Sequence, residues 1–308
     1  MVSNFFRTAP AALLCFLAVL MSVRDADATI IIVVVKSDAI WIGTDGIRTD
    51  GHHWSKVCKV HQAYGGILLK HSKDADEDKT FSADEEIQRL IKTKKALGEF
   101  QKAAALVYKQ NVEKSVEEAL RDTKQNHPEG FDGDLLRLKP SERSAASVDM
   151  GLVFVAVVQG KLIVSELHVE PIAIPVPTLD GSERYRWVVA QPTWETKPTY
   201  EEAYAYPSTP IQKETRTWLI ANPIVRIPDL IMQSESKFPC NEAPPNVLLK
   251  VSPATADPKT HYTASARKQL MNTAKIEYIE PGACPSWKAN PTPAICTFDE
   301  FKREINGR

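Results

Sequence analysis

Residues 29–45 read T-I-I-I-V-V-V-K-S-D-A-I-W-I-G-T-D, and this stretch decides the fold. The β-branched run at 29–36 is typical of a strand that is buried on both faces. Ser37 and Asp38 favour a turn, so 39–45 is expected to be the antiparallel partner of the first strand. The hairpin would bring Asp45 back beside the start of the first strand.

The residues before this hairpin have the pattern of a secretory signal peptide, assigned to 1–28. Arg7 supplies the positive charge, 9–21 is almost continuously apolar, and Ala26-Asp27-Ala28 is an A-x-A cleavage site. The apolar run is too short to span a bilayer, although an uncleaved anchor is the alternative. Cleavage after Ala28 would make Thr29 the first residue of an exported protein, periplasmic or secreted, with no stable membrane span after processing.

Composition excludes several classes of protein. The chain has 308 residues, 25% of them charged and 43% hydrophobic, with a formal net charge of −1. These values exclude a disordered or fibrous protein. They give no electrostatic reason to expect nucleic acid as a partner. Eighteen of the 21 prolines follow residue 170, which predicts a turn-rich second half.

Hydrophobic periodicity predicts strands, then helices, then strands again. Further strands are expected at 56–60, 66–69, 151–158, 161–169, 185–190, 246–251 and 275–279. Helices are expected from Ser82 and over 112–124, with proline-interrupted helical patches at 211–231, while 129–146 and 191–211 are expected to be loops. The strands at 151–158 and 161–169 flank Gln159-Gly160, which predicts a hairpin that places Val153, Val155 and Val157 on one face and buries Leu162, Val164 and Leu167.

Thr29, Asp45 and Lys56 form the candidate catalytic group. A threonine with a free α-amine is both nucleophile and base, since that amine has an ordinary pKa of about 8. It needs a nearby cation that lowers the pKa of the amine and stabilises the developing alkoxide, and an acid that orients this cation. Asp45 ends the second strand and Lys56 starts the next, so both are expected beside Thr29.

Three segments resemble the proteasome-type N-terminal nucleophile hydrolases. They are Thr29-Ile-Ile-Ile-Val-Val-Val, Ile42-Gly43-Thr44-Asp45-Gly46 and Lys56-Val57-Cys58-Lys59-Val60. In that family a terminal threonine leads the first strand, an acidic residue ends the second, and a lysine followed by a β-branched residue starts the third. The spacing from Thr29 to Asp45 is similar to that of the family, and the loop to Lys56 is a few residues shorter than in proteasome subunits.

The resemblance implies an α+β fold, the four-layer αββα sandwich of Ntn hydrolases, over 29–308, with a proline-rich C-terminal elaboration from about residue 191. It implies a threonine peptidase or amidase in which Thr29 attacks a peptide or small amide substrate. Asp45 and Lys56 would assist, and the chain itself could be a partner in a homo-oligomer.

The chain departs from the family near the oxyanion site. Leu68-Leu69-Lys70-His71-Ser72 stands where the family has a glycine-rich step, so the backbone N–H of Lys70 is the candidate oxyanion donor. A serine motif of the family is not recognisable, and Ile47 replaces a common arginine. These departures favour the alternative hypothesis, a catalytically inactive protein that binds a peptide or partner.

No cofactor and no metal is expected from the sequence. His52-His53 is the one pair that suggests zinc, but adjacent side chains diverge and no second ligand pair has suitable spacing. Of the cysteines left after processing, Cys58 is expected to be a reduced thiol. One disulfide is expected within the C-terminal set, with Cys284–Cys296 favoured and Cys240–Cys284 next.

Overall fold

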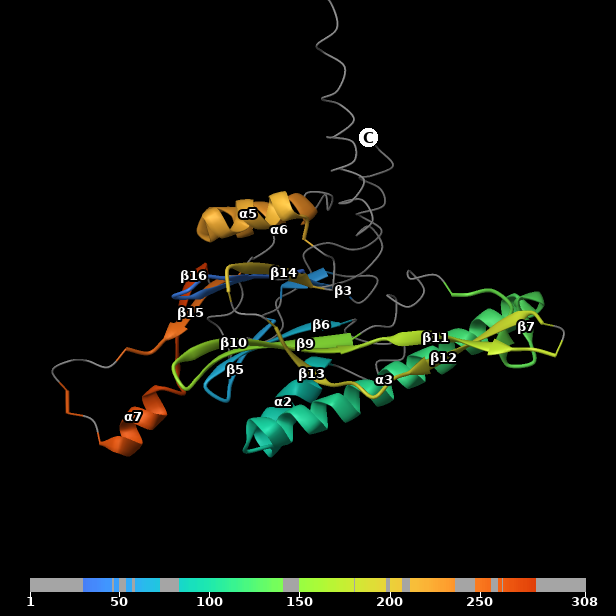
Figure 1. The fold of residues 1–308 in the computed structure, drawn as a ribbon, viewed down its shortest axis with the longest axis horizontal. Coiled ribbons are helices and arrows are strands. Elements are labelled where there is room, and N and C mark those ends of the chain that lie inside the picture. Colours follow the sequence, from blue (N-terminus) through green and yellow to red (C-terminus); the bar gives the residue numbers. More distant parts are fainter. Residues whose placement is uncertain are drawn as a thin grey trace, which may run out of the picture.

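Two five-stranded antiparallel sheets stack face to face in the computed structural model (Figure 1). The structure describes residues 30–45, 47–49, 54–56, 59–72, 83–140, 150–179, 181–197, 200–206, 211–235, 247–255, 260–261 and 263–280. The first sheet has the order β14 (Glu202–Tyr206), β1 (Ile31–Val35), β2 (Ile40–Thr44), β15 (Val247–Pro253), β16 (Ala274–Glu280). The second has the order β13 (Trp194–Lys197), β10 (Lys161–Val169), β9 (Met150–Val158), β6 (Gly66–Ser72), β5 (Val60–Ala63).

The main core lies between these two sheets. Alternate residues of most of these strands enter it, as the two-residue period of a strand requires. From the first sheet come Ile31, Val33, Val35, Ile40, Ile42, Tyr206, Val247, Leu249 and Val251; from the second come Val60, Ile67, Leu69, Val153, Val155, Val157, Leu162 and Val164. Because β1 and β2 are buried on both faces, the continuous apolar run of β1 at Ile31–Val35 needs no alternation with polar residues.

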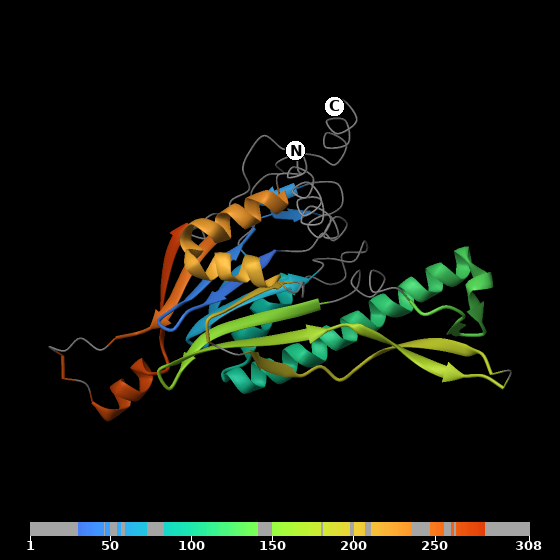
Figure 2. The same ribbon diagram turned by 45° about the horizontal axis from the view of Figure 1, so that its top comes forward.

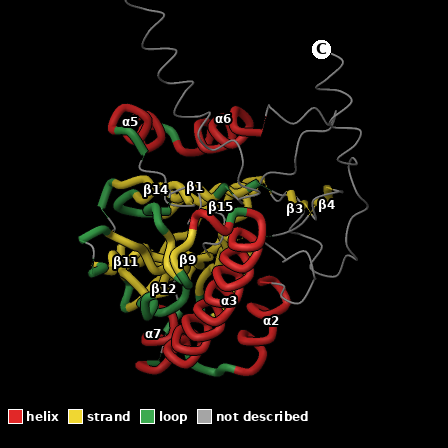
Figure 3. Tube along the Cα trace, turned by 90° about the vertical axis from the view of Figure 1, so that its right-hand side faces the viewer, coloured by secondary structure: helices red, strands yellow, loops and turns green. Residues whose placement is uncertain are grey.

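Helices cover the two outer faces. α5 (Lys213–Ala221) and α6 (Pro223–Glu235) lie on the first sheet, where Leu219, Ile227 and Ile231 meet Ile32 and Val34. α2 (Ala83–Thr93) and α3 (Leu97–Asn126) lie on the second sheet, and Figure 3 shows the succession of layers end-on. α7 (Ala264–Leu270) is a short helix before β16. No helix in the described part of the chain is both long enough and apolar enough to cross a membrane.

A third sheet extends to one side. It has the order β11 (Pro171–Pro177), β12 (Glu183–Val189), β8 (Leu135–Leu136), β7 (Phe131–Asp132), and it lies along the C-terminal part of α3 (Figure 2). β3 (Ile47–Thr49) and β4 (Trp54–Lys56) form a separate two-stranded pair, and η1 (Pro128–Gly130) follows α3.

Although helices cover the outer faces of the two stacked sheets, the expected αββα sandwich of Ntn hydrolases is wrong as a description of the fold class. The fold is β-rich: three antiparallel sheets hold 14 strands, against five helices in the described residues. Two stretches expected to be loops, 129–146 and 191–211, contain the strands β7, β8, β13 and β14. β8, β13 and β14 pair with residues that are distant in the chain, which local periodicity does not report, and β7 then pairs with β8. The region beyond 191 also supplies inner members of the sheets, since β15 lies between β2 and β16.

The hairpin prediction is confirmed. β9 and β10 pair from Val158–Lys161 to Met150–Val169, with positive φ at Gln159 (53°) and Gly160 (77°). Positive φ at both positions is the geometry of a type I′ turn, which fixes the register. Val153, Val155 and Val157 all enter the main core, and Leu162, Val164 and Leu167 are buried.

Gly43 of β2 is a close-approach position under α6. A Cβ there would lie 2.0 Å from Cγ2 of Ile227 and 2.9 Å from Cδ1 of Ile231. We expect Gly43→Ala to lower the free energy of unfolding by about 1–3 kcal/mol, because the overpacked helix must move away. Gly98→Ala in α3 is the control: its Cβ meets nothing within 4 Å, and it should stabilise by about 0.5–1 kcal/mol. Urea unfolding measures both changes, and equal effects would contradict the packing described.

Candidate functional site

Asp45 holds the start of β1 in place. Its carboxylate Oδ1 accepts the backbone N–H of Ile30 at 2.9 Å, and its own N–H donates to the carbonyl of Ile30 at 3.3 Å. β1 and β2 pair in register with Ile31 opposite Thr44, so the two residues meet where the hairpin predicts. Ile30 is the first described residue, and Thr29 precedes it in the chain.

Asp45 also forms a buried ion pair with Lys59. The ammonium of Lys59 donates to Oδ2 of Asp45 at 2.7 Å, and the exposed fractions of the two side chains are 4% for Lys59 and 10% for Asp45. Lys59 directly precedes β5, so the second sheet supplies the cation and the first sheet supplies the anion. Two charges taken out of water stay ionised only when they are paired and hydrogen-bonded. The carboxylate of Asp45 therefore binds the backbone N–H of Ile30 with one oxygen and the ammonium of Lys59 with the other.

The expected catalytic group is only partly within the described structure. Thr29 lies outside the described residues. Lys56 ends β4, where its backbone pairs with Ile47, and its side chain lies outside the described part. The described partner of Asp45 is Lys59, three residues further on. The same signal was present there, because Lys59-Val60 repeats the lysine and β-branched pair of Lys56-Val57.

Lys70, the candidate oxyanion residue, lies in β6 with its side chain fully buried. β5 pairs Val60 with Leu69, so Lys59 precedes this pair and Lys70 follows it. The two lysines are thus brought to the same end of the second sheet. Lys70 pairs in register with Leu152 of β9, within the ladder of strands.

A second polar group lies between the sheets at the same end. The ring of His71 stacks on that of Tyr206 with centroids 5.3 Å apart, and Tyr206 lies opposite Ile31 in the first sheet. Burial, and then the charge of His168, lower the pKa of His71 to about 3, so this imidazole is neutral at pH 7. Burial, and then the charge of Glu166, raise the pKa of Tyr206 well above its usual range.

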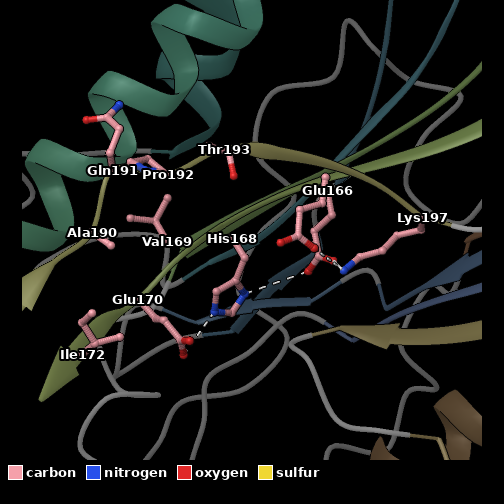
Figure 4. Close-up of a pocket in the computed structure, with 11 residues that line it drawn as sticks. Glu166, His168, Val169, Glu170, Ile172, Ala190, Gln191, Pro192, Thr193 and Lys197 are labelled. Carbon is pink, nitrogen blue, oxygen red and sulfur yellow. Dashed lines mark hydrogen bonds and ion pairs between the residues drawn. The ribbon is translucent and has the colours of Figure 1, made fainter.

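Glu166 and Lys197 form an ion pair beside this group, and Lys197 is the more exposed of the two. Nζ of Lys197 lies 2.8 Å from Oε2 of Glu166 and 3.1 Å from Oε2 of Glu195. Burial lowers the pKa of Lys197, but its hydrogen bonds to these two carboxylates outweigh that effect and raise it overall. Figure 4 shows Glu166, His168 and Lys197 on the wall of a cavity of about 360 Å³.

Neither the second polar group nor its partners were expected from the sequence. Glu166 and His168 are two residues apart on β10 and so share a face, which is a signal that period-two reasoning could have found. His71 joins them only through the pairing of β6 with β9, which the sequence does not reveal. His52-His53 and the cysteines Cys58, Cys240, Cys284 and Cys296 lie outside the described residues, so the disulfide expectation stays a prediction.

No protein-family model matches this chain, and no curated protein matches it either.

Proposed function

We propose that this chain is an exported hydrolase of peptide-type amide bonds, with Thr29 as the nucleophile once residues 1–28 have been removed. The observation that supports this most strongly is the carboxylate of Asp45, which contacts both the amide of Ile30 and the ammonium of Lys59. A buried cation is thereby held close to the point where the chain would begin after cleavage. The proposal depends on the arrangement of these residues and not on membership of the αββα fold class.

Each residue then has a defined role. The hydroxyl of Thr29 attacks the substrate carbonyl while its own α-amine accepts the hydroxyl proton. The amide C–N bond then breaks, and the leaving amine takes that proton from the α-ammonium group, so the acyl group remains as an ester on Thr29. Lys59 keeps the pKa of that amine low and stabilises the alkoxide, which is the role first given to Lys56. Asp45 fixes Lys59 in position. Water then hydrolyses the ester intermediate and regenerates the free threonine.

A binding protein without turnover is the second candidate. It is favoured by Lys70, whose long side chain is fully buried at a step where the resembled family is glycine-rich. Such a protein would have the same terminal threonine and ion pair but would not react.

Trapping by a peptide epoxyketone distinguishes these candidates. This electrophile forms a ring with both the hydroxyl and the α-amine of a terminal threonine, so it requires both groups. We expect the exported protein to gain the mass of one inhibitor molecule, Thr29→Ala to gain none, and Thr29→Ser to retain part of the reaction. Labelling of Thr29→Ala equal to that of the wild type would contradict the proposal, and an unlabelled wild type would favour the binding protein.

A further inference from the structure

His71, Glu166 and His168 converge between the two sheets. His71 belongs to β6 and the other two to β10, and β9 separates these strands. The register places both histidines opposite Gly151 of β9. A Cβ at Gly151 would lie 2.1 Å from two atoms of the His71 ring, so the glycine makes room for that imidazole.

The two histidines have nitrogen atoms without partners in the described structure. Neither Nδ1 nor Nε2 of His71 has a hydrogen-bond partner there, although this side chain is only 1% exposed. Nδ1 of His168 is also buried without a hydrogen bond. Buried polar atoms in folded proteins are almost always satisfied, and those that lack a protein partner commonly bind water or an ion.

The distances suit a metal ion. Nε2 of His71 and Nδ1 of His168 each lie 4.0 Å from Oε1 of Glu166, and one ligand atom from each residue lies within 4.8 Å of the others. Ligand atoms around tetrahedral zinc are roughly 3.3 Å apart, given bonds of about 2.0–2.2 Å. Binding would bring these atoms closer together by roughly 0.7–1.5 Å. We propose that His71, Glu166 and His168 bind one divalent transition-metal ion, for which zinc is the best match.

The neighbouring residues orient this ligand set. Oε2 of Glu170 lies 3.3 Å from Nε2 of His168, which favours a proton on that nitrogen and leaves Nδ1 free to bind the ion. Carboxylates behind histidine ligands commonly have this role. Nζ of Lys197 contacts Oε2 of Glu166 (Figure 4), whereas Oε1 of Glu166 is the oxygen nearest to both histidines.

Two of the three ligands are reached from a cavity. It has a volume of about 360 Å³ and is lined by Glu166 and His168 together with Glu170, Glu195 and Lys197. Three carboxylates against one ammonium make this cavity favourable for a cation. Two nitrogens and one oxygen leave a fourth position of a tetrahedral ion for water, as in catalytic rather than structural zinc sites.

Zinc titration of the exported protein tests this proposal. The chelator-treated protein is titrated with Zn²⁺ against a chromophoric chelator, and its metal content is measured after gel filtration. We expect one zinc ion per chain. His168→Asn, at the more exposed ligand, should weaken binding by at least about 100-fold, and Glu170→Gln by about 10- to 100-fold.

His127→Asn is the matched control, since His127 is an exposed histidine that also lies beside a carboxylate, that of Glu129. It should bind zinc as the wild type does. A wild type without bound zinc, or a folded His168→Asn protein with unchanged affinity, would overturn the proposal. The readout is independent of Thr29, so failure of the metal site and failure of the proposed hydrolase are distinguishable.

Discussion

Replacing Lys59 by alanine should abolish epoxyketone labelling, with a rate at least about 100-fold below that of the wild type. The reason is electrostatic. Without the cation, the amine of Thr29 is a poorer base at neutral pH and the alkoxide has no opposite charge beside it. Lys59 is suited to this role because it is buried and bound to Asp45 at 2.7 Å. Labelling followed by mass spectrometry over time gives the rate directly.

Lys56→Ala is the matched control, because it removes the same side chain three residues earlier. It should label at nearly the wild-type rate. Lys59→Arg preserves a charge next to Asp45 and should retain part of the reaction, provided that circular dichroism shows all three proteins to be folded. The opposite result, loss in Lys56→Ala and normal labelling in Lys59→Ala, would return the role to Lys56.

Asp45→Asn should lower the free energy of unfolding by about 3–5 kcal/mol, because it leaves the ammonium of Lys59 buried without a counter-charge. The amide can still accept the N–H of Ile30, so the lost charge is the main change. Denaturant unfolding measures the loss. The same variant should also label slowly, since nothing then holds Lys59 in position.

Two comparisons isolate the effect of burial. Lys109 and Glu113 form an ion pair of similar length, 2.8 Å, but with side chains that are 23% and 41% exposed. Glu113→Gln should therefore change stability by no more than about 0.5 kcal/mol. The double variant Asp45→Asn with Lys59→Met should regain part of the lost stability but none of the labelling, since no buried charge is left unpaired. A small effect of Asp45→Asn alone would show that the pair is solvated.

Local signals in the sequence predicted much of the secondary structure. The apolar run before Ser37 and the Gln159-Gly160 turn each predicted a hairpin that the structure contains. Both signals are local, because side-chain alternation and turn geometry depend on only a few residues. The predicted helix at 112–124 is real but shorter than α3, which extends over Leu97–Asn126. The alanine-rich first half of α3 has a weaker periodic pattern, and packing on the second sheet stabilises it there.

The fold class was wrong because sheet membership depends on distant pairing. Nothing within 202–206 shows that this segment completes the first sheet beside β1. The same holds for 135–136, which joins the third sheet through the pairing of Leu136 with Tyr185 of β12. Short, half-exposed strands like these have compositions that also suit loops, so the β content was underestimated.

The candidate site was partly predictable. The hairpin that leads into Asp45 follows from local pattern, and the structure confirms that Asp45 lies beside the start of β1. The sequence predicted Lys56 as the cation and did not single out Lys59, whose contact with Asp45 depends on how the second sheet packs against the first. The group formed by His71, Glu166 and His168 required the full order of the second sheet.

The N-terminal residue of the exported protein tests the central claim most directly. The mature protein is digested, and its terminal peptide is sequenced by mass spectrometry. The account predicts a peptide that begins with Thr29 and carries a free α-amine. A terminus at any other residue, or a blocked amine on Thr29, would contradict the account. In either case no threonine with a free α-amine would lie beside the ion pair of Asp45 and Lys59.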